Sequence, residues 1–181
     1  MKEPIIKLKT IVMGGVIAAA YVALTLLSSF LGISSGFIQL RLSEALCILP
    51  IFTPAAVPGL FVGCIIGNLI TGSMITDIIC GSLATLLGAL GTYFLRKNRY
   101  LAVIPPILVN AIILPFIFIF VYGSSKSYFY FLASIFISEF IMVALLGSIL
   151  YSALEKYPTI FEDEDDGLIE GPTEKEELEK T

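Results

Sequence analysis

The sequence has very few charged side chains through most of its length. Between Thr10 and Leu154 there are only eight, namely Arg41, Glu44, Asp77, Arg96, Lys97, Arg99, Lys126 and Glu139. A water-soluble domain of this length needs many more charges to cover its surface, so lipid must surround most of the chain. The composition agrees, with 57% apolar residues and a mean hydropathy of +0.94. The sequence therefore predicts an integral membrane protein, in which each isolated charge lies at a membrane edge, in a polar cavity or in a pair.

Histidine is absent, which excludes a Ser-His-Asp triad, a Cys-His pair and the usual zinc sites. Cys47, Cys64 and Cys80 lie in apolar sequence at spacings unlike those of a metal site, so we expect them to be small core residues. The chain also lacks a P-loop, and any energy from ATP must come from a partner. We expect no catalytic residues, no metal, no cofactor and no nucleic-acid partner. An enzyme that uses Glu44, Asp77 and Glu139 as acids or metal ligands is the least favoured alternative.

Four apolar segments have about the 20 residues that a membrane-spanning helix needs. They are residues 11–32, 75–95, 101–122 and 128–154. The stretch from Phe37 to Gly72 is too long for one crossing and contains Pro50, Pro54 and Pro58. It is predicted to form two helices that meet at the TPAAVPG turn, the first of them short and covering about residues 43–51.

The basic residues decide the topology, because short basic loops favour the cytoplasm. Six crossings place three basic groups on the same side of the membrane: the N-terminal lysines, the RKNR break at residues 96–99, and Lys156. We therefore predict an all-α bundle of six transmembrane helices with both termini in the cytoplasm. Residues 1–10 are the cytoplasmic N-terminus and residues 11–154 the transmembrane domain. Residues 155–181, which are strongly acidic, are predicted to be a disordered cytoplasmic tail.

Glu139 is predicted to lie near the middle of the bilayer, where a carboxylate costs on the order of 2.5 to 3.5 kcal/mol. Asn110, in the preceding helix, lies at a similar depth. One interpretation is that these two side chains hydrogen-bond to each other or to a neighbouring helix and hold the bundle together. The alternative is that they face a ligand cavity, which is typically apolar with a few orienting polar groups.

Other polar residues can converge on the same region from different helices. Arg41 and Glu44 share one face of the short second helix, either as an ion pair or as groups that hold a solute. Asp77 comes early in the fourth helix, where its carboxylate favours the positive end of the helix, and Asn68 adds an amide from the third. The candidate substrate-binding residues are therefore Arg41, Glu44, Asn68, Asp77, Asn110 and Glu139.

Small residues form a stripe along the first helix. Gly15, Ala19 and Ala23 recur every four residues, with Gly14 and Ala18 beside them. Such a stripe lets another helix approach closely. It either packs inside the bundle or forms a docking face for a separate membrane subunit.

The run RLSEALCILPIFTPAAVPGLFVGCIIGNLI, followed by DIICGSLATLLGAL, resembles the QueT family of substrate-binding subunits of energy-coupling factor (ECF) transporters. The resemblance covers residues 11–154 and extends to the candidate binding residues. It implies a six-helix substrate-binding (S) subunit in the plasma membrane of a prokaryotic cell. Such a subunit captures a queuosine precursor, a deazaguanine base, or a similar nutrient from outside. It joins a membrane coupling subunit, through the small residues of the first helix, and two cytoplasmic ATPase subunits.

A different class of function is also compatible with the residues. Glu139 can relay protons in a stand-alone secondary transporter or channel that works as an oligomer. The absence of a detectable inverted repeat makes this alternative less favoured.

Overall fold

The computed structural model describes residues 8–34, 39–121, 123, 126–157 and 160–161. This part of the chain is helical and contains no strand. Four helical segments are long and apolar enough to cross a membrane: residues 8–30, 75–94, 99–120 and 128–154. The four long spans predicted from the sequence are thus confirmed to within a few residues. Most of the predicted N-terminal segment and most of the acidic tail lie outside the described residues.

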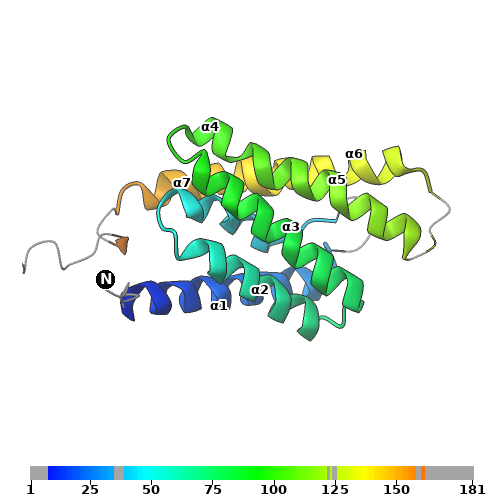
Figure 1. Cartoon of the computed structure of the whole chain (residues 1–181), viewed down its shortest axis with the longest axis horizontal. Helices are drawn as coiled ribbons and strands as arrows, with labels where there is room; N and C mark the ends of the chain where they lie inside the picture. The colour runs from blue at the N-terminus through cyan, green and yellow to red at the C-terminus, as the bar shows by residue number, and fades with distance from the viewer. Residues whose placement is uncertain (1–7, 35–38, 122, 124–125, 158–159, 162–181) are drawn as a thin grey trace, which may run out of the picture.

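The helices follow one another with short connections. In chain order they are α1 (Leu8–Phe30), the 3-10 helix η1 (Leu42–Ile51), α2 (Ala56–Ile70), α3 (Ile75–Phe94), α4 (Arg99–Ala102), α5 (Ile104–Phe120), α6 (Tyr128–Glu139), the π-helical segment η2 (Phe140–Leu146) and α7 (Gly147–Leu154). The start of α1, the connection from α3 to α4 and the end of α7 lie at one end of the molecule (Figure 1). The end of α2, the end of α5 and the start of α6 lie at the other end. The basic RKNR break is therefore at the same end as Lys9.

The short helix η1 lies at the centre of the bundle. It contacts α1, α2, α3, α4, η2 and α7, and its residues from Ser43 to Pro50 are all buried. A 3-10 helix rises about 2.0 Å per residue, compared with 1.5 Å in an α-helix, so ten residues reach further into the bundle in this form. The two helices predicted for residues 37–72 are confirmed, and α2 begins inside the TPAAVPG turn.

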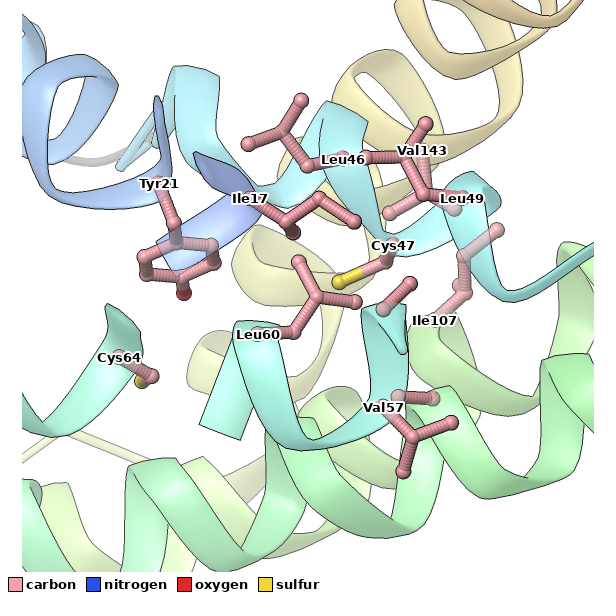
Figure 2. Packing of buried hydrophobic residues seen from close by; sticks show 12 residues of the cluster. Ile17, Tyr21, Leu46, Cys47, Leu49, Val57, Leu60, Cys64, Ile107 and Val143 are labelled. Atoms are coloured by element: carbon pink, nitrogen blue, oxygen red, sulfur yellow. The ribbon is translucent and has the colours of Figure 1, made fainter. Parts of the chain in front are cut away.

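Apolar side chains from several helices meet around η1. Tyr21 of α1, Cys47 of η1 and Leu60 of α2 point into a common interior (Figure 2) and are almost completely buried. Ile107 of α5 and Val143 of η2 complete this core from the other side. Cys47 and Cys64 are small buried core residues, as the sequence indicates, whereas Cys80 is only partly buried, so the same expectation does not hold for it.

Glycines allow α1 and α2 to pack closely. A Cβ atom at Gly59 would lie 2.7 Å from the carbonyl oxygen of Gly14, and one at Gly63 would lie 2.9 Å from that of Ala18. Both distances are too short for real contacts, so only glycine fits at these two positions of α2. Gly14 and Ala18 of the predicted stripe therefore pack inside the bundle.

Candidate functional site

A small cavity lies between α3, α5, α6 and the extended segment before η1. It is lined by Gln39, Arg41, Asp77, Gly81, Leu114, Phe118, Ile135, Ser138 and Glu139. Three of these, Arg41, Asp77 and Glu139, carry charges and come from three separate parts of the chain. The cavity volume of about 30 Å³ has room for about one water molecule.

Glu139 is the last residue of α6 and contributes a carboxylate to this cavity. The residue is only 6% exposed. Its Oε1 atom accepts a hydrogen bond of 3.0 Å from the Asn110 amide, whereas its Oε2 atom is buried without a hydrogen-bond partner among the described residues. An unsatisfied buried carboxylate oxygen is costly, so its retention requires an explanation. The backbone changes to the wider π-helical η2 directly after Glu139, a feature often found at functional sites.

Both sequence-based interpretations of Glu139 describe part of the geometry. The hydrogen bond to Asn110 joins α5 to α6, as expected if the pair holds the bundle together. The second carboxylate oxygen has no hydrogen-bond partner among the described residues and lies at the cavity. A ligand-binding role for Glu139 stays a prediction. Asn110 itself does not line the cavity but fixes the carboxylate that does.

Arg41 and Asp77 contribute the other two ionisable side chains of the cavity lining. Arg41 precedes η1 in extended conformation and is half-buried. Its Nη1 atom donates to Asn68 Oδ1 at 3.4 Å, so Asn68 supports a lining residue without lining the cavity itself. Asp77 lies in the first turn of α3, as predicted, and lines the cavity as well.

Glu44 has a different environment from the other candidate residues. It is only 4% exposed, but it is absent from the cavity lining. Its Oε1 accepts a hydrogen bond of 2.5 Å from the Tyr21 hydroxyl, and its Oε2 accepts one of 3.2 Å from the Cys47 thiol. The ion pair considered for Arg41 and Glu44 does not form within residues 39–121, because the Glu44 carboxylate points toward α1 instead. A substrate-binding role for Glu44 stays a prediction.

Sequence reasoning missed several residues that line the cavity. Ser138 is the sequence neighbour of Glu139, and this position is the signal that could have identified it as a lining residue. Gly81, Leu114 and Phe118 gave no signal, because apolar residues on a membrane helix look alike whether they face lipid, core or a cavity.

The small-residue stripe of α1 is divided between two faces. Gly14 and Ala18 face α2, whereas Gly15, Ala19 and Ala23 are exposed. A shallow apolar groove of about 310 Å³ runs between α1 and α2. It is lined by Thr10, Ile11, Gly14, Gly15, Ala18, Pro58, Gly59 and Val62. The predicted docking residues thus remain accessible on the outside of the bundle.

An all-helical apolar bundle that surrounds a few buried polar groups at one cavity has the form of a solute-binding membrane protein. The model of the QueT transporter family matches residues 11–156, and the chain belongs to this family. The resemblance predicted from the sequence is confirmed. No curated protein and no solved structure matches the chain.

Proposed function

We propose that this transporter protein is the substrate-binding subunit of an ATP-driven ECF importer and captures a queuosine precursor, a deazaguanine base, or a similar small nutrient. The observation that supports this most is Glu139 Oε2, a buried carboxylate oxygen at a polar cavity with no hydrogen-bond partner among the described residues. Such an atom can accept a hydrogen bond from a solute without giving up one inside the protein.

The chemistry of the cavity suits a guanine-like edge. Such an edge presents two adjacent N-H donors, which one carboxylate accepts together, and a carbonyl oxygen, which arginine binds. Glu139 takes the first role and Arg41 the second, while Asn110 and Asn68 hold these two side chains in place. Asp77 and Ser138 are further polar partners at the cavity wall. Glu44 is the weaker candidate, because both of its oxygens already accept hydrogen bonds.

Binding requires the cavity to widen. Its volume of about 30 Å³ is well below the roughly 300 Å³ at which ligand pockets usually begin. Gln39 and Arg41 belong to a segment outside the helices, so their movement breaks fewer backbone hydrogen bonds than movement of α3, α5 or α6. Capture is thus proposed to couple ligand binding to a shift of this segment.

The ligand is tested by thermal stabilisation of the purified protein, because a bound ligand raises the unfolding temperature by mass action. The panel contains guanine, 7-deazaguanine and its 7-aminomethyl derivative, with adenine and cytosine as controls. We expect stabilisation by the deazaguanines, and a much smaller effect in Glu139→Gln. A flat response to every purine would contradict the proposal.

The topology proposed is six crossings, with η1 and α2 as the two short ones and residues 1–10 and 155–181 in the cytoplasm of a prokaryotic cell. The test uses a Cys80→Ala background with a single added cysteine. Asn98→Cys, in the basic break, is expected to be protected from an impermeant thiol reagent in intact cells. Ser127→Cys, at the start of α6, is the control at the other end of the bundle and is expected to react. Labelling of Asn98→Cys would overturn the orientation.

A membrane coupling subunit, acting with two cytoplasmic ATPase subunits, is proposed to dock on the exposed face formed by Gly15, Ala19 and Ala23. A large side chain there prevents close helix approach. Ala19→Leu is therefore expected to abolish uptake in cells that hold the complete transporter, while ligand binding by the isolated chain is unchanged. Leu26→Ala, on the exposed surface of the same helix, is the control. Uptake by the purified chain alone in vesicles would instead favour the stand-alone transporter.

A further inference from the structure

A second polar pocket lies between α4, η1 and α7, at the end of the molecule that carries the basic RKNR break (Figure 1). Its volume is about 160 Å³, roughly five times that of the cavity at Glu139. The described residues that line it include one cation, four hydroxyl groups and no acid. They are Arg99, Tyr100, Ser148, Tyr151 and Ser152, together with the apolar Ile48 and Val103. The proposed capture of a solute makes no use of this pocket.

Two tyrosines hold the Arg99 side chain at the pocket. The guanidinium carbon of Arg99 lies 4.8 Å from the ring centre of Tyr100 and 5.6 Å from that of Tyr151. Its Nη2 atom donates a hydrogen bond of 2.8 Å to the Tyr100 hydroxyl. The Tyr151 ring in turn packs against Phe52, with ring centroids 5.0 Å apart. Because this hydrogen bond uses only one of the five N-H donors of a guanidinium, the others can bind an anion.

The hydroxyl groups of the pocket suit an anion as well. The Tyr100 hydroxyl accepts its hydrogen bond from Arg99, so its own proton can be donated to a ligand. Ser148 and Ser152 are four residues apart on α7 and share one face of the helix. Glu155, the nearby acid, accepts a hydrogen bond of 3.2 Å from the Tyr151 hydroxyl and is not part of the lining. An arginine surrounded by hydroxyl donors is a typical arrangement for binding phosphate oxygens.

The depth of the pocket favours a phosphate group that belongs to a lipid. Arg99 is the first residue of the apolar span 99–120, and Ser152 lies close to the end of the span 128–154. Lipid headgroups lie at this level of a membrane. Leu101 and Ile149, beside the lining residues in sequence, expose apolar side chains to the surroundings. The pocket is smaller than the roughly 300 Å³ at which sites for whole small molecules usually begin, so it fits a headgroup whose acyl chains remain outside.

We propose that this pocket binds the phosphate group of an anionic lipid such as phosphatidylglycerol. The Arg99 guanidinium binds the phosphate oxygens, and the hydroxyls of Ser148 and Ser152 donate further hydrogen bonds to the headgroup. Arg96 and Lys97, exposed in the same basic break, attract the anionic lipid to this end of the bundle without lining the pocket. The bound lipid joins α4 to α7. This site goes beyond the proposed function and does not depend on the solute that the protein captures.

The first test changes the charge at the pocket. Phosphatidylglycerol is titrated into the purified full-length chain in micelles of a neutral detergent, and its affinity is obtained from the rise in unfolding temperature. Arg99→Gln is expected to weaken binding by about fifteenfold or more, the usual value of hydrogen bonds to a charged group. Arg96→Gln is the matched control, because it removes the same charge from the same break outside the pocket. It is expected to weaken binding by no more than about fivefold.

The second test fills the pocket without changing its charge. Ser152→Leu places a large side chain in the space for the headgroup and is expected to weaken binding by about tenfold or more. Ala153→Leu, which adds an equally large side chain at the next residue outside the lining, is the control and is expected to bind as the wild type does. Both positions are exposed, so we expect the unfolding temperatures of the lipid-free variants to match that of the wild type.

Inorganic phosphate and diacylglycerol distinguish the sources of the ligand. We expect neither to stabilise the protein as phosphatidylglycerol does at the same concentration, because the first lacks acyl chains and the second lacks the phosphate. Equal stabilisation by inorganic phosphate would assign the pocket to a soluble ligand and overturn the lipid assignment, and equal stabilisation by diacylglycerol would overturn the phosphate site. Equal losses in Arg96→Gln and Arg99→Gln, or wild-type affinity in Ser152→Leu, would show attraction to surface charge alone and contradict the proposal.

Discussion

The two buried glutamates differ in how their carboxylates are satisfied. Glu44 is 4% exposed and Glu139 is 6% exposed, so burial does not distinguish them. Both oxygens of Glu44 accept hydrogen bonds from the protein, whereas one oxygen of Glu139 has no partner among the described residues and lies at a cavity. We therefore propose that the Glu44 carboxylate holds the bundle together, whereas the unpartnered oxygen of Glu139 accepts a hydrogen bond from a ligand.

The largest effect expected from this comparison is on stability. Glu44→Ala leaves the Tyr21 hydroxyl and the Cys47 thiol without their acceptor and opens a cavity in the core. We expect a loss of about 3 kcal/mol in the free energy of unfolding, measured by denaturant unfolding in detergent micelles. Glu139→Gln is the matched control and is expected to lose less than about 1 kcal/mol, because its unpartnered oxygen contributes no hydrogen bond. Equal losses of unfolding free energy in the two variants would contradict the difference between the Glu44 and Glu139 carboxylates.

A smaller loss of stability is expected when the Tyr21 hydroxyl, which donates a hydrogen bond to Glu44, is removed. Tyr21→Phe keeps the ring in the core but leaves Glu44 Oε1 without a partner, which costs about 1 to 2 kcal/mol of unfolding free energy. Tyr157→Phe, at an exposed position, is the control and is expected to have no measurable effect. Wild-type stability in Tyr21→Phe would show that the Glu44 carboxylate is satisfied in another way.

The smallest effect concerns the residue that positions Glu139. Asn110→Ala removes the hydrogen bond to Glu139 Oε1. The ligand must then fix the orientation of the Glu139 carboxylate, which weakens binding. We expect the affinity for 7-deazaguanine to fall about fivefold, equivalent to about 1 kcal/mol, in an equilibrium binding assay. Asn98→Ala, which removes the amide that caps α4, is the control. An unchanged affinity in Asn110→Ala would mean that Glu139 is oriented without its neighbour.

The sequence predicts much of the fold because membrane helices carry strong local signals. Apolar length defines the four long spans, and the closely spaced prolines near Pro54 locate the break between η1 and α2. The 3-10 form of η1 and the π-helical form of η2 were not predicted. They depend on how each segment fits among its neighbours, which local sequence does not encode.

The candidate site could be predicted only in part, for a similar reason. Isolated charges such as Arg41 and Glu139 are conspicuous in an apolar sequence, and both line the cavity. The partners of Glu44 could not be predicted, since Tyr21 lies 23 residues away on another helix. The sequence also gave no way to see that the α1 stripe divides, with Gly14 facing α2 and Ala19 exposed.

The most direct test of the account compares the affinities of Glu139→Gln and Glu44→Gln for 7-deazaguanine, each measured at a temperature where the variant is folded. We expect the Glu139 carboxylate to accept two charge-assisted hydrogen bonds from the ligand. Glu139→Gln is therefore predicted to bind the ligand at least thirtyfold more weakly, equivalent to about 2 kcal/mol. Glu44→Gln is predicted to bind within about threefold of wild type. A loss at Glu44→Gln as large as that at Glu139→Gln, or no loss at Glu139→Gln, would contradict the assignment of Glu139 as the carboxylate that holds the ligand.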